Sequence, residues 1–350
     1  SLTDVEGKVY LKRLIRFIEK EYKQTIKNRE RMVTSKAVSY EMLWVFYTEN
    51  LDIWYRCAMS GQQVGGIITS TQQFEHPQYC FRVYIDVIEY DGVGFKHCKL
   101  ERDIDKFDGE VSFSDLPVVP FEHSTAQDFL KESIIANGKQ FFELSSGHHF
   151  MSYEGPLVRE RNLRIEKFKA DGRVMIDLQS FATMNPDYNM GNSKPPNKCD
   201  VKMLKEKNTY IKTNELHKDS NYFLASALVY GFSFSVKEWG LFEVSKFSDI
   251  VFDIDALDHV VMAQNKKKML EGLVSQSGDP IRNINDQLDN SLDQSMKSLD
   301  PIANKGNGCI FLCYGPPGTG KTLTAQSVAE YLRLPLWVLT VRELGSSPES

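Results

Sequence analysis

The sequence lacks the features that mark membrane-spanning, secreted and disulfide-bonded proteins. Its unbroken apolar runs reach only six residues, as at 309–314, whereas a helix needs about 20 to span a bilayer. The first residues include no hydrophobic segment of a signal peptide, so we expect a protein that is not secreted. None of the six cysteines forms a Cys-x-x-Cys pair, which favours reduced thiols over a disulfide framework or a zinc site. We therefore expect an intracellular protein of the cytoplasm or nucleus.

A strong excess of positive charge is also missing. Lys and Arg number 42 against 47 for Asp and Glu, which gives a net charge of −5. This balance argues against a protein that coats nucleic acid, so nucleic acid is not an expected partner. Apolar residues make up 41% of the 350 residues, and this length and composition fit two or three globular domains.

The N-terminal segment, residues 1–50, is predicted to be helical. Apolar residues recur at three- and four-residue steps over 8–35, with Lys and Arg between them, as in an amphipathic helix. Residues 1–40 carry ten basic and five acidic side chains. A basic helix of this kind could contact nucleic acid or anionic lipid, or it could be a solvated helix face. The apolar positions are Leu11, Leu14, Ile15, Ile18, Tyr22 and Ile26.

Residues 51–245 are predicted to form a β-rich domain with at least one helix. Apolar and polar residues alternate over 81–88, and Asp91-Gly92 then predicts a hairpin turn before 93–100. Asp-Gly recurs at 108–109 and 171–172, the latter before a strand at 174–176. The pattern Ser124-x-x-Gln127 predicts a capping box for a helix to about residue 142. A last strand pair is expected at 229–236 and 239–244. The fold class of this region is thus α+β.

Residues 246–307 are predicted to be a linker that contains one short helix. The helix is expected over 265–274, and it is followed by a stretch rich in Ser, Asp and Asn from residue 275 to residue 308. Such a composition is typical of loops.

A phosphate-binding motif follows the linker. Its pattern is G-x-x-x-x-G-K-[ST], the P-loop. Glycines let the backbone curl so that successive N–H groups converge on phosphate oxygens. Lys321 is expected to reach the β- and γ-phosphates of a nucleotide, and the hydroxyl of Thr322 is expected to bind Mg²⁺. The motif residues are Gly315, Pro316, Pro317, Gly318, Thr319, Gly320, Lys321 and Thr322.

The sequence around the motif has the pattern that a P-loop requires. An apolar run at 309–314 precedes it and reads as a buried parallel strand. A helix is predicted from residue 321 to residue 332, and residues 336–339 read as the next buried strand. Strand, glycine loop, helix and strand together predict that residues 308–350 form the start of an α/β P-loop NTPase domain.

The motif and its surroundings resemble a known family. The P-loop followed by Leu323-Thr324-Ala325 is similar to that of AAA+ ATPases, and residues 308–350 closely resemble fungal AAA-type ATPases. The resemblance there includes Ala329-Glu330-Tyr331 and the Arg-x-Pro-Leu pattern at 333–336. Upstream segments resemble a domain of unassigned function that precedes the ATPase module in those proteins. These segments are residues 43–46, 115–118, 151–155 and 172–177.

The resemblance implies ATP and Mg²⁺ as cofactors, with Leu323 added to the phosphate-binding residues. It further implies that Val260 and Val261 contact adenine through their backbone, although core packing explains these valines equally well. Family members assemble into homo-oligomeric rings and remodel macromolecular clients. They also place an Asp-Glu pair and an arginine finger beyond the P-loop region, so the chain is expected to be truncated after its P-loop.

Two other functions remain open at this point. One is a nucleotide-sensing adaptor that binds ATP without hydrolysing it and acts through its upstream domain. The other is a small-molecule kinase with a P-loop, which fits less well because such enzymes usually begin with the P-loop. Here about 314 residues precede the motif.

Overall fold

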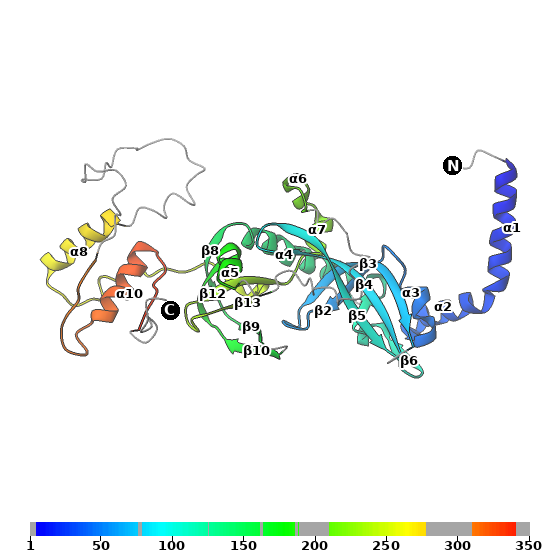
Figure 1. Ribbon diagram of the computed structural model, residues 1–350, viewed down its shortest axis with the longest axis horizontal. Coiled ribbons are helices and arrows are strands. Elements are labelled where there is room, and N and C mark those ends of the chain that lie inside the picture. Colours follow the sequence, from blue (N-terminus) through cyan, green and yellow to red (C-terminus); the bar gives the residue numbers. More distant parts are fainter. Residues whose placement is uncertain are drawn as a thin grey trace. The chain divides into compact units, whose positions relative to one another are not determined.

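A computed structural model describes residues 5–75, 79–124, 126–161, 164–185, 188, 210–277 and 310–340. The chain divides into two compact units, Ser1–Ser248 and Asp249–Ser350. Figure 1 shows the helices and strands of both. Among the described helices, none combines the length and the apolar character needed to cross a membrane.

The chain begins with two helices where the sequence predicted one. Helix α1 (Val5–Glu21) and helix α2 (Lys23–Ser35) are separated at Tyr22. Helix α2 ends at Ser35, and the next residue, Lys36, has a left-handed backbone (φ 54°) and donates its N–H to the carbonyl oxygen of Val33. Met32 of α2 is buried in the core of the first unit, so α2 is anchored to that unit by packing.

A five-stranded antiparallel sheet forms the first part of this unit, in the order β5-β4-β3-β2-β7. The predicted Asp-Gly hairpin is confirmed, because β4 and β5 pair from Tyr90 opposite Phe95 outward. Asp91 stabilises the turn by accepting hydrogen bonds from the N–H groups of Val93 and Gly94. The strands are β2 (Asp52–Arg56), β3 (Gln63–Phe74), β4 (Cys80–Tyr90), β5 (Phe95–Asp105) and β7 (Val118–Pro120).

A small sheet pairs β1 (Ala37–Ser39) with β6 (Glu110–Ser112). Strand β6 follows the Asp-Gly dipeptide at 108–109, but its partner comes from the N-terminal end of the unit. This dipeptide therefore makes a turn without making a hairpin, and Gly109 supplies the positive φ of 77°.

A seven-stranded antiparallel sheet completes the unit, in the order β10-β9-β13-β12-β11-β8-β14. The predicted last strand pair is confirmed, since β12 and β13 pair around a turn in which Lys237 has a φ of 60°. The predicted strand at 174–176 lies in β11. The strands are β8 (His148–Tyr153), β9 (Pro156–Arg161), β10 (Arg164–Lys169), β11 (Gly172–Asp177), β12 (Leu228–Ser233), β13 (Glu238–Glu243) and β14 (Phe247–Ser248).

Helices of the first unit are short apart from α1, α2 and α4. The α-helices are α3 (Leu43–Phe46), α4 (Gln127–Leu144), α5 (Leu178–Met184), α6 (Thr213–Leu216) and α7 (Asp219–Phe223). Single 3₁₀ turns cover Tyr40–Met42, Phe113–Asp115, Phe121–His123 and Val244–Lys246.

The predicted capping box at the start of α4 is wrong. The residue before the helix is Ala126 in a left-handed conformation (φ 54°), and no side chain caps the helix. The hydroxyl of Ser124 instead accepts a hydrogen bond of 2.7 Å from the indole N–H of Trp54. A buried indole N–H needs an acceptor. The hydroxyl oxygen of Ser124 fills this role for Trp54 and does not cap α4.

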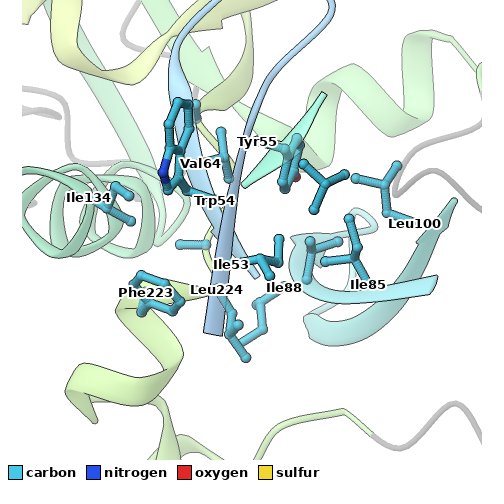
Figure 2. Close-up of a cluster of buried hydrophobic side chains, with 14 of the residues drawn as sticks. Ile53, Trp54, Tyr55, Val64, Ile85, Ile88, Leu100, Ile134, Phe223 and Leu224 are labelled. Atoms are coloured by element: carbon cyan, nitrogen blue, oxygen red, sulfur yellow. The ribbon is translucent and has the colours of Figure 1, made fainter. Parts of the chain in front are cut away.

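Part of the core of the first unit lies between the five-stranded sheet and helices α4 and α7, and the same cluster continues into the seven-stranded sheet through residues such as Tyr153, Val174 and Phe242. Figure 2 shows part of it: Trp54 of β2 lies on the same side as Ile134 of α4 and Phe223 of α7, whereas Tyr55 of β2, Ile85 of β4 and Leu100 of β5 lie on the other side of β2. The two helices approach closely at Gly138, where an added Cβ would lie 1.9 Å from the carbonyl oxygen of Tyr222. The chain therefore needs glycine at this position.

The second unit contains α8 (Gln264–Ser277) and α10 (Lys321–Leu332), which contact each other. Both were predicted from the sequence. The two strands predicted beside the P-loop are not formed: the described residues 310–314 and 334–340 are irregular, and Ile310 and Leu312 are almost fully exposed. A strand needs a neighbouring strand to bond its N–H and C=O groups, and the described residues of this unit form no strand. Cys309 and residues 278–308 of the predicted linker lie outside the described residues.

Candidate nucleotide-binding site

Three glycines shape the loop that precedes α10. Gly315, Gly318 and Gly320 have φ values of 146°, 84° and 82°, in a region that favours glycine over other residues. A Cβ added at Gly318 or Gly320 would meet no atom within 4 Å. The loop backbone is therefore open on the side where these glycines lack side chains, as a phosphate group requires.

Hydrogen bonds hold the loop in this curled form. The hydroxyl of Thr319 donates to the carbonyl oxygen of Pro316 at 2.9 Å. The ammonium group of Lys321 donates to the carbonyl oxygens of Gly315 and Pro316 at 2.9 and 2.8 Å. The lysine thus folds back over the loop, and its charge lies beside the backbone that the motif assigns to phosphate.

Helix α10 begins directly at the end of the loop. Gly320 precedes it without a side-chain cap, and the N–H of Thr324 donates to the carbonyl oxygen of Gly320 at 2.8 Å. The N–H groups of Lys321, Thr322 and Leu323 therefore precede the helical hydrogen bonds. They lie at the positive end of the helix dipole, which favours an anion by about 0.3–1 kcal/mol.

The remaining predicted residues of the loop are accessible. Pro316, Pro317, Thr322 and Leu323 are all exposed, so solvent and ligands can reach the loop and the first turn of α10. The residues present fit a triphosphate: curled backbone, free amides and a lysine can hold phosphate oxygens, and the hydroxyl of Thr322 can bind Mg²⁺. When bound, Mg²⁺ neutralises charge that develops on the phosphates.

The two valines predicted to contact adenine differ in their surroundings. Val260 is buried, at 8% exposure, whereas Val261 is fully exposed. Both belong to the same compact unit as the P-loop. The segment before them is joined to α10, because the N–H of Asp253 donates to the carboxylate of Glu330 at 3.2 Å. Their contact with adenine stays a prediction.

Two side-chain contacts near this segment could not be predicted from the sequence. In the sequence, Glu330 stands out only as part of the Ala329-Glu330-Tyr331 segment that resembles AAA-type ATPases. Its hydrogen-bond partner, Asp253, lies 77 residues earlier in the chain. Buried Lys267 of α8 pairs with Asp258, and this hydrogen bond lowers the pKa of the Asp258 carboxyl. The pair joins α8 to the segment that carries the valines.

Comparison with known proteins gives two family matches. The model of the "ATPase family associated with various cellular activities (AAA)" matches residues 311–348, which contain the loop and α10. The model of a "Domain of unknown function (DUF7025)" matches residues 28–125, from α2 through the five-stranded sheet. Neither a curated protein nor a solved structure matches the chain. The chain is thus similar to AAA ATPases at its P-loop and to a domain of unassigned function upstream.

Proposed function

We propose that residues 315–323 bind the phosphates of ATP together with Mg²⁺, and that the complete protein hydrolyses ATP as an AAA-type ATPase. The observation that carries this proposal is the curled loop with three positive-φ glycines that leads directly into the uncapped start of α10. The AAA match over residues 311–348 independently indicates ATP binding and ATPase activity in general.

The chemistry would come from positioning and electrostatics. Phosphoryl transfer needs charge neutralisation around the transferred group and little covalent chemistry from the protein. Lys321 would leave the loop carbonyls and donate to phosphate oxygens, while the amides of the loop would hold the same group. The acidic pair and arginine finger that the fungal AAA-type resemblance implies would lie beyond the P-loop segment. Hydrolysis is therefore assigned to a protein that carries them.

The upstream domain would supply specificity. In this proposal the β-rich first unit recognises a macromolecular client, and a homo-oligomeric ring of ATPase modules remodels that client during ATP turnover. Support for this part is the position of a separate folded unit ahead of the P-loop and the resemblance to AAA-type proteins with such a domain.

Substitution of Lys321 tests the nucleotide site. Isothermal titration of the full chain with Mg-ATP should show binding, and Lys321→Ala should weaken it by about a hundredfold or more, because charge-assisted hydrogen bonds to phosphate are lost. Lys266→Ala is the matched control, since Lys266 is an exposed lysine on α8. Equal affinity in the wild type and Lys321→Ala would refute the proposed site.

Turnover separates an ATPase from a nucleotide-sensing adaptor. Phosphate release by the complete protein, measured with and without Lys321→Ala, should show hydrolysis that depends on this lysine. ATP binding with no phosphate release would instead identify an adaptor that senses the nucleotide.

A further inference from the structure

Helix α1 presents apolar side chains to solvent along its length. Every described side chain from Lys8 to Glu21 is exposed, including Tyr10 at 67% and Phe17 at 63%. In proteins, an amphipathic helix gains most of its stability from packing its apolar face. The described residues provide no such packing for α1. The exposed apolar side chains are Val9, Tyr10, Leu11, Leu14, Ile15, Phe17, Ile18 and Tyr22.

Apart from Val9, which lies among the basic side chains, the apolar side chains of α1 form one broad face of the helix, and Tyr22 follows its last residue. At 3.6 residues per turn, the arc from Phe17 through Leu14 and Ile18 to Ile15 covers roughly 160° of the circumference. The opposite side is mainly basic, with Val9 and Glu19 among its positive charges. It carries Lys12, Arg13, Arg16 and Lys20, and in the described part of the chain none of these four forms an ion pair.

We propose that α1 lies on an anionic lipid surface, with its apolar face in the boundary between headgroups and acyl chains. A helix with a wide apolar face and a polar face rich in Lys and Arg has the composition of interfacial helices. Each Lys or Arg near an anionic surface contributes attraction that salt screens. The basic side chains of α1 would supply this attraction, and the apolar face would supply the buried area.

Nucleic acid fits this helix less well than lipid. A nucleic acid backbone would neutralise the basic side, but it would leave side chains such as Leu14, Phe17 and Ile18 exposed. The breadth and continuity of the apolar face are therefore explained by lipid and not by phosphates alone.

A second copy of the chain also fits less well. A two-stranded coiled coil needs a narrow apolar seam repeated over several heptads, whereas α1 has 17 residues and a broad face. Pairing two copies would also bring together helices that each carry five basic and three acidic residues. The net positive charge of α1 is attracted to an anionic surface, and it repels a second copy of α1.

The first unit can carry α1 to such a surface. Helix α2 continues the chain from Tyr22, and its Met32 is anchored in the core of that unit. Figure 1 shows α1 leading into α2 at the N-terminal end of the ribbon. Membrane contact through α1 thus requires no rearrangement of the β-sheets, and it would hold the first unit beside the lipid.

Sedimentation with vesicles tests the proposal on the full chain. We expect binding to vesicles of phosphatidylcholine with 30% phosphatidylserine, at least tenfold weaker binding to pure phosphatidylcholine vesicles, and loss of binding as salt rises. Two variants separate the contributions. Leu14→Gln with Ile18→Gln removes apolar area, and Arg13→Gln with Arg16→Gln removes charge; each should weaken binding at least tenfold. Gln is a good helix former, so circular dichroism should show a retained fold.

A matched control uses Lys266→Gln with Lys268→Gln, which removes the same charge from exposed positions of α8. This control should bind vesicles like the wild type. The proposal is overturned if the α1 variants bind vesicles as the wild type does, or if the control weakens binding equally. It is also overturned if α1 mediates a dimer in analytical ultracentrifugation without any vesicle binding, or if it binds duplex DNA and not vesicles.

Discussion

At the scale of single residues, glycines decide where the backbone of this protein can go. In the P-loop they allow the positive φ values that curl the chain around a phosphate site. In α4, Gly138 allows the backbone of Tyr222 to approach the helix axis. The sequence reveals the first role, because the spacing of a P-loop is specific. It does not reveal the second role, because the sequence around a glycine within a helix does not show which distant backbone packs against it.

Gly138→Ala should destabilise the first unit by about 1–3 kcal/mol, as expected for overpacking against backbone. The added Cβ would lie 1.9 Å from the carbonyl oxygen of Tyr222. This oxygen is a backbone atom, so it cannot rotate away as the end of a side chain could. Thermal unfolding followed by circular dichroism measures the effect.

The control for this prediction is Gly272→Ala in α8. An added Cβ at Gly272 meets nothing within 4 Å, so alanine should leave the first unit unchanged and favour α8 by about 0.5–1 kcal/mol. An unfolding midpoint for Gly138→Ala equal to that of the wild type would show that α4 and α7 do not pack as described.

At the scale of elements, local patterns predict where helices and strands lie better than they predict their partners. The hairpin at Asp91-Gly92 and helices α8 and α10 follow from turn residues and periodicity. The strand after Asp108-Gly109 was also marked by a turn, yet it pairs with β1, more than 70 residues away. Ser124 shows the same limit, because an acceptor for Trp54 cannot be distinguished from a helix cap by spacing alone.

The β4–β5 hairpin should show a pH dependence that arises at His97. A 2.8 Å hydrogen bond to Asp86 raises the pKa of the His97 imidazole above its ordinary value. The stabilisation is therefore fully present below the ordinary histidine pKa of 6.5 and is lost as pH rises through the raised pKa. Because half of the His97 side chain is exposed, the contribution should be about 0.2–1 kcal/mol.

Asp86→Asn should remove this contribution. We expect the variant to be less stable than the wild type at pH 5.5, with the difference shrinking by pH 8, and the NMR titration midpoint of the His97 ring to fall. In His97→Gln, the same asparagine substitution should produce no pH-dependent difference. A titration midpoint that is unchanged by Asp86→Asn would contradict the role of this hydrogen bond.

At the scale of the whole molecule, the two compact units differ in how much of their secondary structure can be predicted from the sequence. The first unit combines three antiparallel sheets with one large hydrophobic core and a small second cluster, and its α+β class follows from alternation and turns. In the second unit, the P-loop and its helix were predicted, whereas the two flanking strands are irregular in the described residues. A parallel strand depends on neighbours, so its apolar sequence alone does not ensure that it forms.

The most direct test of the central claim is backbone hydrogen exchange across the full chain with and without Mg-ATP. The amides of Gly315 and of residues 318–323 should exchange more slowly when the nucleotide is present, because they would donate to phosphate oxygens; Pro316 and Pro317 have no N–H. Strands β4 and β5 of the first unit should exchange at unchanged rates. If the amides of Gly315 and of residues 318–323 exchange at the same rate with saturating Mg-ATP as without it, the account that this loop holds the phosphates is contradicted.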